Sequence, residues 1–261
     1  MPELPDVDVY KTYLNACGLH QGISDIEITE PRILVETSSA ALKRYLKNKQ
    51  FTATDRYGKH LFVHTDGAMI VHMHFGMTGF LKYFKNKNEC PAHTRLLIRF
   101  VNDYHLAFSC RRLLGQVGLA SGVEDFIAAN DLGPDALQIS FDAFKEAMQG
   151  SQKAIKSLLM DQTKIAGLGN VYVDEILFHA RLHPKIAARR LSEEQLNTLY
   201  QTMIDVLRYA IDKKADPERF GASYLLPQRH KNGRCPRCKT ALSQIKITGR
   251  TSYLCRQCQK G

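Results

Sequence analysis

The sequence lacks long apolar runs, and its last 33 residues lack acidic side chains. No run of eighteen apolar residues occurs, which argues against a membrane-spanning helix. The N-terminus also lacks the basic and then apolar pattern of a signal peptide. The chain contains no internal repeat and no low-complexity tract. We therefore expect a soluble, cytoplasmic protein that has no contact with a membrane.

Positive charge is concentrated at the C-terminus. Residues 229–261 contain nine Lys or Arg residues and no Asp or Glu. The chain has 36 basic residues in total, so the 27 outside this tail are nearly balanced by its 26 acidic residues. Such a concentration favours a polyanionic partner, most often nucleic acid. A basic tail that only aids solubility is the alternative.

Four of the seven cysteines lie within this basic tail. They form two Cys-x2-Cys pairs separated by sixteen residues, the spacing of a tetrahedral thiolate site for one structural zinc: Cys235, Cys238, Cys255 and Cys258. The other three cysteines are scattered and odd in number, which is typical of packing residues in a reducing compartment. The sequence therefore predicts a cationic zinc finger.

The rest of the chain divides into a β-rich part and a helical part. A helix is predicted from Pro5 to Gly18, followed by short β-rich runs that indicate an antiparallel sandwich: 23–35, 51–56, 59–65, 68–75, 80–84, 95–101 and 104–109. From about Asp125 the pattern becomes helical, with these predicted helices: 141–148 capped by Ser140, 154–160 capped by Ser151, 171–180, and 192–214 opened by a capping box. The glycines of 164–170 permit a tight turn at a helix start, where backbone amides can hold a phosphate.

The N-terminal residues could supply a nucleophile. Removal of Met1, which we expect because the second residue is small, would expose Pro2 as a secondary amine. Such an amine can attack an electrophilic sugar carbon and form an iminium. Glu3 would be a neighbouring proton donor, and Asp6 could orient the amine or hold water. By itself this is a weak signal, because the pattern is more typical of an ordinary helix start.

Several motifs in order along the chain resemble those of the formamidopyrimidine-DNA glycosylase and endonuclease VIII family. The opening residues 1–8 and the segment His74-Phe-Gly-Met77-Thr-Gly79 match the family, and the resemblance is closer to formamidopyrimidine-DNA glycosylases. Further matches run to the end of the chain: 132–135, 159–162, 167–172 with Glu175, and 253–258.

The resemblance implies an α+β fold in three parts. These are an N-terminal antiparallel β-sandwich catalytic domain with flanking helices (1–125), a helical domain with a helix-two-turn-helix (126–228) and a C-terminal β-hairpin zinc finger (229–261). It implies a monomeric, bacterial-type, nucleoid-associated enzyme that acts on double-stranded DNA containing oxidised bases or abasic sites. Such an enzyme flips out a damaged base, cleaves its glycosidic bond and nicks the strand by β,δ-elimination through a Schiff base.

The resemblance also implies roles for individual residues. Pro2 would attack C1′, Glu3 would open the deoxyribose and Lys59 would contact DNA beside the lesion, while Asp6 and Glu175 would support the active site. Other residues would bind DNA: His74, Met77, Arg111, Leu113, Lys156, Asn170, Tyr172 and Arg250. Extruding a nucleotide leaves a hole in the duplex, which Met77 is long and flexible enough to fill. Arg111 could hydrogen-bond the orphaned base. The alternative is that Met77 only fills the hydrophobic core and that Arg111 is only a solvated charge.

Some positions depart from the family pattern. Asp6 stands where the family usually has Glu, and the loop 109–115 has no intercalating Phe. Leu113 or Leu114 could be the wedge between bases instead. The segment 215–234 is shorter than the loop that covers a flipped 8-oxoguanine, so formamidopyrimidines or further-oxidised bases are the expected substrates. His72 and His74 share one face of a predicted strand, but no third metal ligand is evident.

Two other kinds of protein remain as alternatives. A non-catalytic damaged-DNA-binding protein could retain the same scaffold. An RNA-associated zinc-ribbon protein would bind RNA tightly without preferring lesions.

Overall fold

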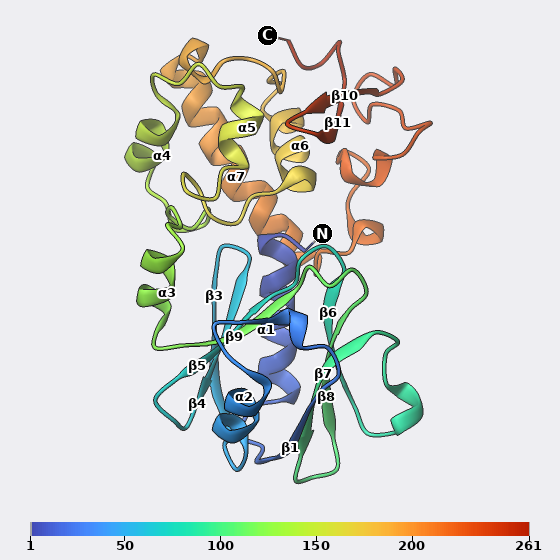
Figure 1. Cartoon of the computed structure of the whole chain (residues 1–261). Helices are drawn as coiled ribbons and strands as arrows, with labels where there is room; N and C mark the ends of the chain where they lie inside the picture. The colour runs from blue at the N-terminus through green and yellow to red at the C-terminus, as the bar shows by residue number, and fades with distance from the viewer. Residues whose placement is uncertain (1, 261) are drawn as a thin grey trace. The chain divides into compact units, whose positions relative to one another are not determined.

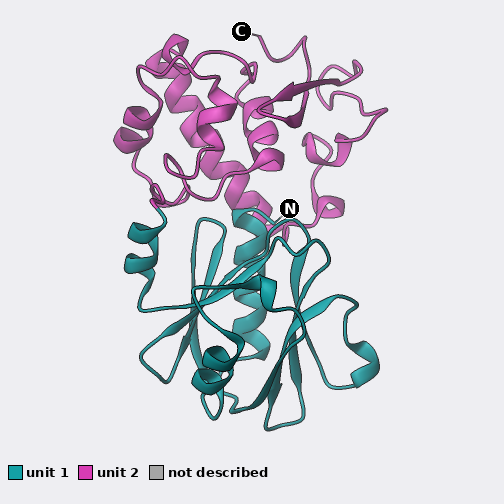
Figure 2. Ribbon diagram, in the orientation of Figure 1, with its two compact units in different colours: residues 1–130 teal, residues 131–261 magenta. Residues whose placement is uncertain are grey.

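The computed structural model describes residues 2–260, so Met1, whose removal we expect, lies outside the described residues. The chain folds into two compact units, residues 1–130 and 131–261 (Figure 2). None of the described helices is both long enough and apolar enough to cross a membrane. The predicted domain boundaries at 125/126 and 228/229 stay predictions.

The first unit consists of two sheets and helix α1 (Leu4–Cys17) (Figure 1). One sheet has the order β1-β7-β8-β6, and its strands are β1 (Ile23–Ile28), β7 (Thr94–Phe100), β8 (His105–Cys110) and β6 (Gly79–Phe84). The other has the order β2-β9-β5-β4-β3, and its strands are β2 (Leu34–Val35), β9 (Gln116–Ala120), β5 (Ile70–His74), β4 (His60–Thr65) and β3 (Phe51–Tyr57). Two short helices complete the unit: α2 (Ser39–Leu46) and α3 (Val123–Ala129).

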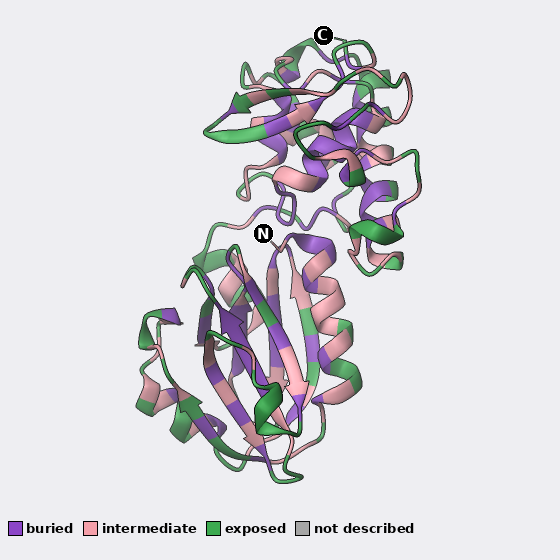
Figure 3. Ribbon diagram, turned by 90° about the vertical axis from the view of Figure 1, so that its right-hand side faces the viewer, coloured by how far each residue is buried: buried purple, intermediate pink, exposed green. Residues whose placement is uncertain are grey.

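One hydrophobic core joins α1 to both sheets. Val7 and Leu14 of α1 are fully buried with Met73 of β5 and Phe108 of β8. Buried positions recur along the strands, as Figure 3 shows. The predicted sandwich is therefore confirmed, except that β2 pairs with β9 in parallel.

The second unit contains four helices and a β-hairpin among its described residues. These are α4 (Phe141–Met148), α5 (Ile155–Leu159), α6 (Asn170–His179), α7 (Glu193–Asp212), and the hairpin β10 (Ser243–Ile247) and β11 (Arg250–Leu254). The predicted caps of α4 and α7 are confirmed, since Ala143 N donates to Ser140 Oγ (3.2 Å) and Ser192 forms a capping box with Gln195. The predicted α+β fold class is confirmed.

The predicted N-cap of α5 is wrong. Ala154, not Ser151, is the N-cap. Ser151 Oγ accepts from the amide of Lys153 (3.2 Å), and the amide of Arg189 donates to the Ser151 carbonyl (3.0 Å). Because the backbone around Ser151 pairs with a distant segment, the helix begins later in the sequence than predicted.

Candidate DNA-binding and catalytic sites

The N-terminal residues lie directly before α1. Pro2 is partly exposed, whereas Glu3 is 1% exposed. The amide of Glu3 donates to Asp6 Oδ2 (2.9 Å). Burial raises the pKa of Asp6 to about 6, although this bond lowers it. The structure thus places the partly exposed Pro2 beside the buried Glu3 and the partly buried Asp6.

Lys59 lies in the two-residue turn between β3 and β4, not on the strand as the sequence predicted. The preceding Gly58 has a φ of 55°, a left-handed conformation that glycine adopts without steric cost. Lys59 is only 7% exposed. A contact between Lys59 and DNA stays a prediction.

Three histidines pack together on β4 and β5. The rings of His72 and His74 lie 5.0 Å from that of His60, and His60 Nδ1 is 2.8 Å from His72 Nε2. Burial lowers the pKa of His72 to about 3 and that of His74 to about 4, aided for His74 by the charge of Lys59. His74 is therefore neutral at pH 7, and it accepts a hydrogen bond from the amide of Gly76. Within residues 2–260, no group of metal-ligating side chains includes these histidines.

Two loops of the first unit bring exposed side chains together. Gly76, with a φ of 57°, lies so close to the Leu114 backbone that a Cβ there would come within 2.3 Å of Leu114 O. The amide of Arg112 also donates to Thr78 Oγ1 (3.2 Å). Met77 and Leu114, on these loops, are 40% and 49% exposed.

Leu113 and Leu114, the two candidate wedge residues, differ in how far they are exposed. Leu113 is partly buried against the core, with a φ of 54°, whereas Leu114 is exposed. Arg111 is exposed on the same loop. The structure thus presents Met77, Arg111 and Leu114, while the side chain of Leu113 packs inward.

The second unit positions Asn170 at the first residue of α6. Gln162 holds the preceding glycine loop, because its side chain donates to Leu168 O (2.9 Å) and accepts from the amide of Gly167 (3.1 Å). Asn170 Nδ2 donates to Thr251 O on β11 (3.0 Å). Lys156, expected at a phosphate-binding surface, is fully buried, and its ammonium group donates to Asn170 Oδ1 (2.7 Å).

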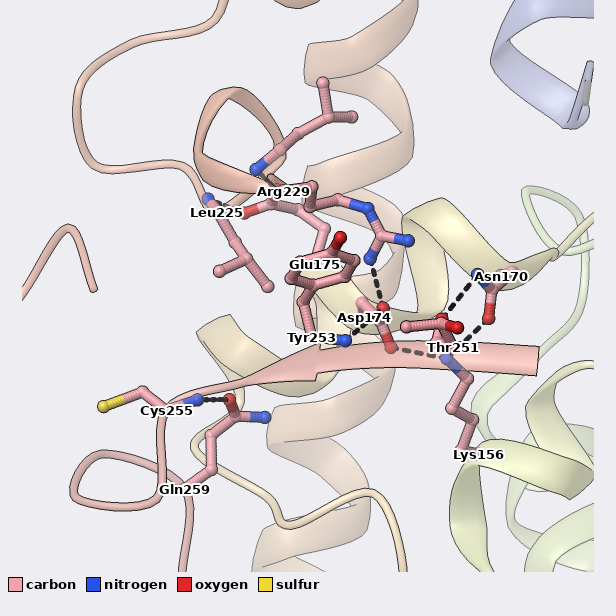
Figure 4. A network of polar contacts seen from close by, with 11 residues as sticks. Lys156, Asn170, Asp174, Glu175, Leu225, Arg229, Thr251, Tyr253, Cys255 and Gln259 are labelled. Carbon is pink, nitrogen blue, oxygen red and sulfur yellow. Dashed lines mark hydrogen bonds and ion pairs between the residues drawn. The ribbon is translucent and has the colours of Figure 1, made fainter. Parts of the chain in front are cut away.

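Two further predicted residues of α6 are also buried. Glu175 accepts hydrogen bonds from the amides of Leu225 (2.8 Å) and Leu226 (2.6 Å) (Figure 4). Glu175 therefore anchors the 225–226 segment, and its support of the active site stays a prediction. Tyr172 is 3% exposed, and its contact with DNA stays a prediction.

The four tail cysteines converge as a metal site. Their sulfur atoms all lie within 4.8 Å of one another. Cys235 Sγ lies 3.7 Å from Cys258 Sγ, and Cys238 Sγ lies 3.4 Å from Cys255 Sγ. Tetrahedral zinc with Zn–S bonds of about 2.3 Å requires sulfur separations of about 3.8 Å. The residues present therefore fit one structural zinc, as the sequence predicted.

The hairpin beside this site presents the predicted finger arginine. Thr248 and Gly249 form its two-residue turn with φ of 46° and 75°, the left-handed pair that this tight connection requires. Arg250 follows at the start of β11 and is exposed.

The sequence reasoning missed Asp174 and Arg229. Asp174 is buried on α6 and pairs with Arg229. No local pattern could have indicated Asp174, because its partners lie far from it in the sequence.

Comparison with known sequences supplies the family. Residues 1–117 match the formamidopyrimidine-DNA glycosylase N-terminal domain, 132–220 its H2TH domain, and 233–261 the zinc finger found in FPG and IleRS. A formamidopyrimidine-DNA glycosylase of Mycoplasma mobile is 30% identical over all of this chain and 99% of its own. One from Streptococcus pyogenes is 32% identical with the same coverage. The chain belongs to the formamidopyrimidine-DNA glycosylase family.

Solved structures of this family agree with the fold. Lactococcus lactis Fpg in complex with abasic-site DNA has a TM-score of 0.90 at 29% identity, covering 99% of this chain and 100% of that one. A Lactococcus lactis Fpg complex with DNA containing N7-benzyl-Fapy-dG has the same TM-score and identity and covers all of both chains. This formamidopyrimidine-DNA glycosylase family member is thus a DNA glycosylase of base excision repair, and its partner is DNA. AP lyase activity is typical of the family.

Proposed function

We propose that this glycosylase removes oxidised bases, formamidopyrimidines first, and nicks the strand through a Schiff base on Pro2. The observation that carries the proposal is Pro2 next to Glu3, the N-cap of α1, with the buried Glu3 and the partly buried Asp6 beside it. The unprotonated nitrogen of Pro2 attacks C1′ and the C1′–base bond breaks, so the bonding pair leaves with the base. The Pro2 nitrogen then loses its proton to the departing base, which restores the nitrogen lone pair.

The acid beside Pro2 accounts for the next step. Glu3 protonates the ring oxygen of the deoxyribose, so that the ring opens and the nitrogen lone pair forms an iminium at C1′. Loss of a proton from C2′ then expels the 3′ phosphate, and a second elimination expels the 5′ phosphate. Water finally hydrolyses the remaining imine and regenerates Pro2.

The exposed loops support extrusion of the base. A flipped nucleotide leaves a hole in the stack and an unpaired opposite base. Met77 is flexible enough to fill the hole, Leu114 is the exposed wedge, and Arg111 can hydrogen-bond the opposite base. We therefore assign the wedge to Leu114 instead of Leu113.

Phosphate binding is proposed for the second unit. Asn170 lies at the start of α6, and Arg250 is exposed beside the hairpin turn. A helix N-terminus and an arginine both favour phosphate oxygens. His74, neutral at pH 7, is proposed to contact the DNA as a hydrogen-bonding group.

Borohydride trapping on duplex DNA with an abasic site tests the proposal. Protein with a confirmed Pro2 terminus should form a covalent adduct, whereas protein carrying one extra N-terminal residue should form none. Glu3→Gln should lose nicking of a lesion-containing duplex but still nick a preformed abasic site, because that sugar already opens spontaneously. No adduct from the correctly processed protein would favour the alternative, a non-catalytic damaged-DNA-binding protein, which the departures at Asp6 and the wedge loop motivate.

A further inference from the structure

Asp174 is bonded to three separate segments of the second unit. Its side chain is 1% exposed on α6. Oδ1 accepts from Lys156 Nζ of α5 at 2.5 Å, and Oδ2 accepts from the amide of Tyr253 on β11 at 2.9 Å. Oδ2 also pairs with the guanidinium group of Arg229 (Figure 4). One buried carboxylate therefore joins α5, the segment before the finger and the strand β11.

These bonds close a ring that includes Asn170. Lys156 Nζ donates to both Asp174 and Asn170 Oδ1, and Asn170 Nδ2 donates to the carbonyl of Thr251. From Thr251 the backbone of β11 leads to Tyr253 and back to Asp174. The ring fixes the orientation of the Asn170 amide and the register of β11 relative to α6, and Arg250 directly precedes Thr251.

Asp174 also holds the zinc finger at two points, one before each pair of cysteines. Arg229 lies six residues before Cys235, where the chain enters the finger, and Tyr253 lies two residues before Cys255, on the returning strand. The Arg229 guanidinium carbon lies 4.9 Å from the centre of the Tyr253 ring, so these two residues are also in contact with each other. A displaced carboxylate would remove both of these bonds to α6 and leave Asn170 as the bond from α6 to β11.

We propose that Asp174, with Arg229 as its partner, is a positioning residue for DNA phosphate binding by Asn170 and Arg250. The proposal rests on the phosphate contacts assigned to those two residues under the proposed function. A buried ion pair is by itself a weak source of stability. The ion pair matters here because it fixes the positions of the elements that carry Asn170 and Arg250.

The test is binding of Asp174→Asn to a duplex with a tetrahydrofuran abasic-site analogue, measured by fluorescence anisotropy over a range of KCl concentrations. The matched control is Asp212→Asn, which removes the same charge from a carboxylate that is 68% exposed on α7. Asp174→Asn should bind about tenfold more weakly and lower the salt slope by about one, although its added positive charge alone would favour binding. Asp212→Asn should bind as well as the parent protein.

Two further readouts separate positioning from general destabilisation. Adding Asp174→Asn to Arg250→Ala should cost little more than Arg250→Ala alone, because both lose the same phosphate contact. The nicking rate at saturating abasic DNA should be unchanged while KM rises. If Asp174→Asn unfolds, Arg229→Gln gives the same readouts, since its side chain is partly exposed and its loss leaves the Tyr253 bond in place.

The outcomes are distinct. Three results would overturn the positioning role. The first is binding by Asp174→Asn equal to that of Asp212→Asn, and the second is an additive loss of affinity when Asp174→Asn is combined with Arg250→Ala. The third is loss of zinc from both Asp174→Asn and Arg229→Gln. If Arg250→Ala and Asn170→Ala themselves bind with the parent affinity and salt slope, the proposed phosphate contacts fail instead.

Discussion

Burial of the Asp6 carboxyl group makes the free energy of unfolding depend on pH. Its pKa is about 6 in the folded protein, against an ordinary value of 3.8, because burial disfavours the charged form. The folded state therefore holds a proton on Asp6 at pH values where the unfolded state has lost it. The free energy of unfolding must fall as pH rises from about 4 to about 6 through this group.

Asp6→Asn should remove this pH dependence. Between pH 4 and pH 7 the parent protein should lose up to about 3 kcal/mol of stability relative to the variant, from two pKa units at about 1.4 kcal/mol each. Urea denaturation at several pH values measures the difference. Asp103→Asn, at an exposed turn, is the control, and its free energy of unfolding should change with pH as that of the parent protein does. The same pH dependence in Asp6→Asn and the parent protein would contradict the expected pKa of Asp6.

Leu114 and Leu113 make a matched pair for the wedge. Leu114→Ala should lower kcat/KM for a lesion in duplex DNA by about tenfold, because less apolar surface enters the unstacked step. Leu113→Ala should instead lower stability by about 1–2 kcal/mol through lost core packing. Steady-state excision and thermal unfolding of both variants distinguish these effects. Equal excision by Leu114→Ala and the parent would contradict the wedge assignment.

At the scale of the element, the zinc finger depends on its metal because it has little core of its own. The buried cluster around it contains Phe178 of α6, Leu225 and two of the cysteines. Arg237 adds a contact from the finger to α6, with its guanidinium carbon 4.4 Å from the Phe178 ring centre. Without zinc, four thiols cannot replace the folding energy that the metal supplies.

Cys238→Ser should therefore lose zinc, unfold the tail and weaken DNA binding by about a hundredfold, because the tail carries nine cationic residues. Metal analysis, limited proteolysis and anisotropy with duplex DNA measure the three effects. Cys90→Ser changes an exposed cysteine of the first unit and should alter none of them. Parent-like affinity in a verified zinc-free variant would refute the dependence.

At the scale of the whole molecule, the segment 215–234 bears on the choice of lesion. It is short and anchored: Glu175 binds the amides of Leu225 and Leu226, and the rings of Tyr209 and Tyr224 stack at 4.2 Å. It contains the short 3-10 helices η4 (Pro217–Arg219) and η5 (Leu226–Gln228). That this segment is too short to cover a flipped base stays a prediction. Lesions that need no such cover should be preferred.

A panel of duplexes with the same sequence and opposite base tests this preference. Formamidopyrimidine lesions should be excised with a kcat/KM at least about tenfold above that of 8-oxoguanine, since a missing flap removes contacts worth about 1–3 kcal/mol. Single-turnover excision rates give the comparison, with an abasic-site duplex as the control for lyase chemistry. Fastest release of 8-oxoguanine would overturn the preference.

The sequence by itself determined the features that depend on local chemistry. The spacing of the cysteines specifies a tetrahedral thiolate site, the caps of α4 and α7 follow from Ser140 and Ser192, and alternating apolar residues specify the strands. Ordered motifs also identified the family and most of the candidate site residues.

Tertiary structure alone decided the features that depend on contacts between distant residues. The start of α5 moved because backbone near Ser151 pairs with Arg189, and Leu114 instead of Leu113 is exposed because Leu113 packs against the core. Asp174 has no local signal, since its partners lie 18 to 79 residues away. Burial and long-range hydrogen bonding are properties of the folded chain, so no local pattern of residues encodes them directly.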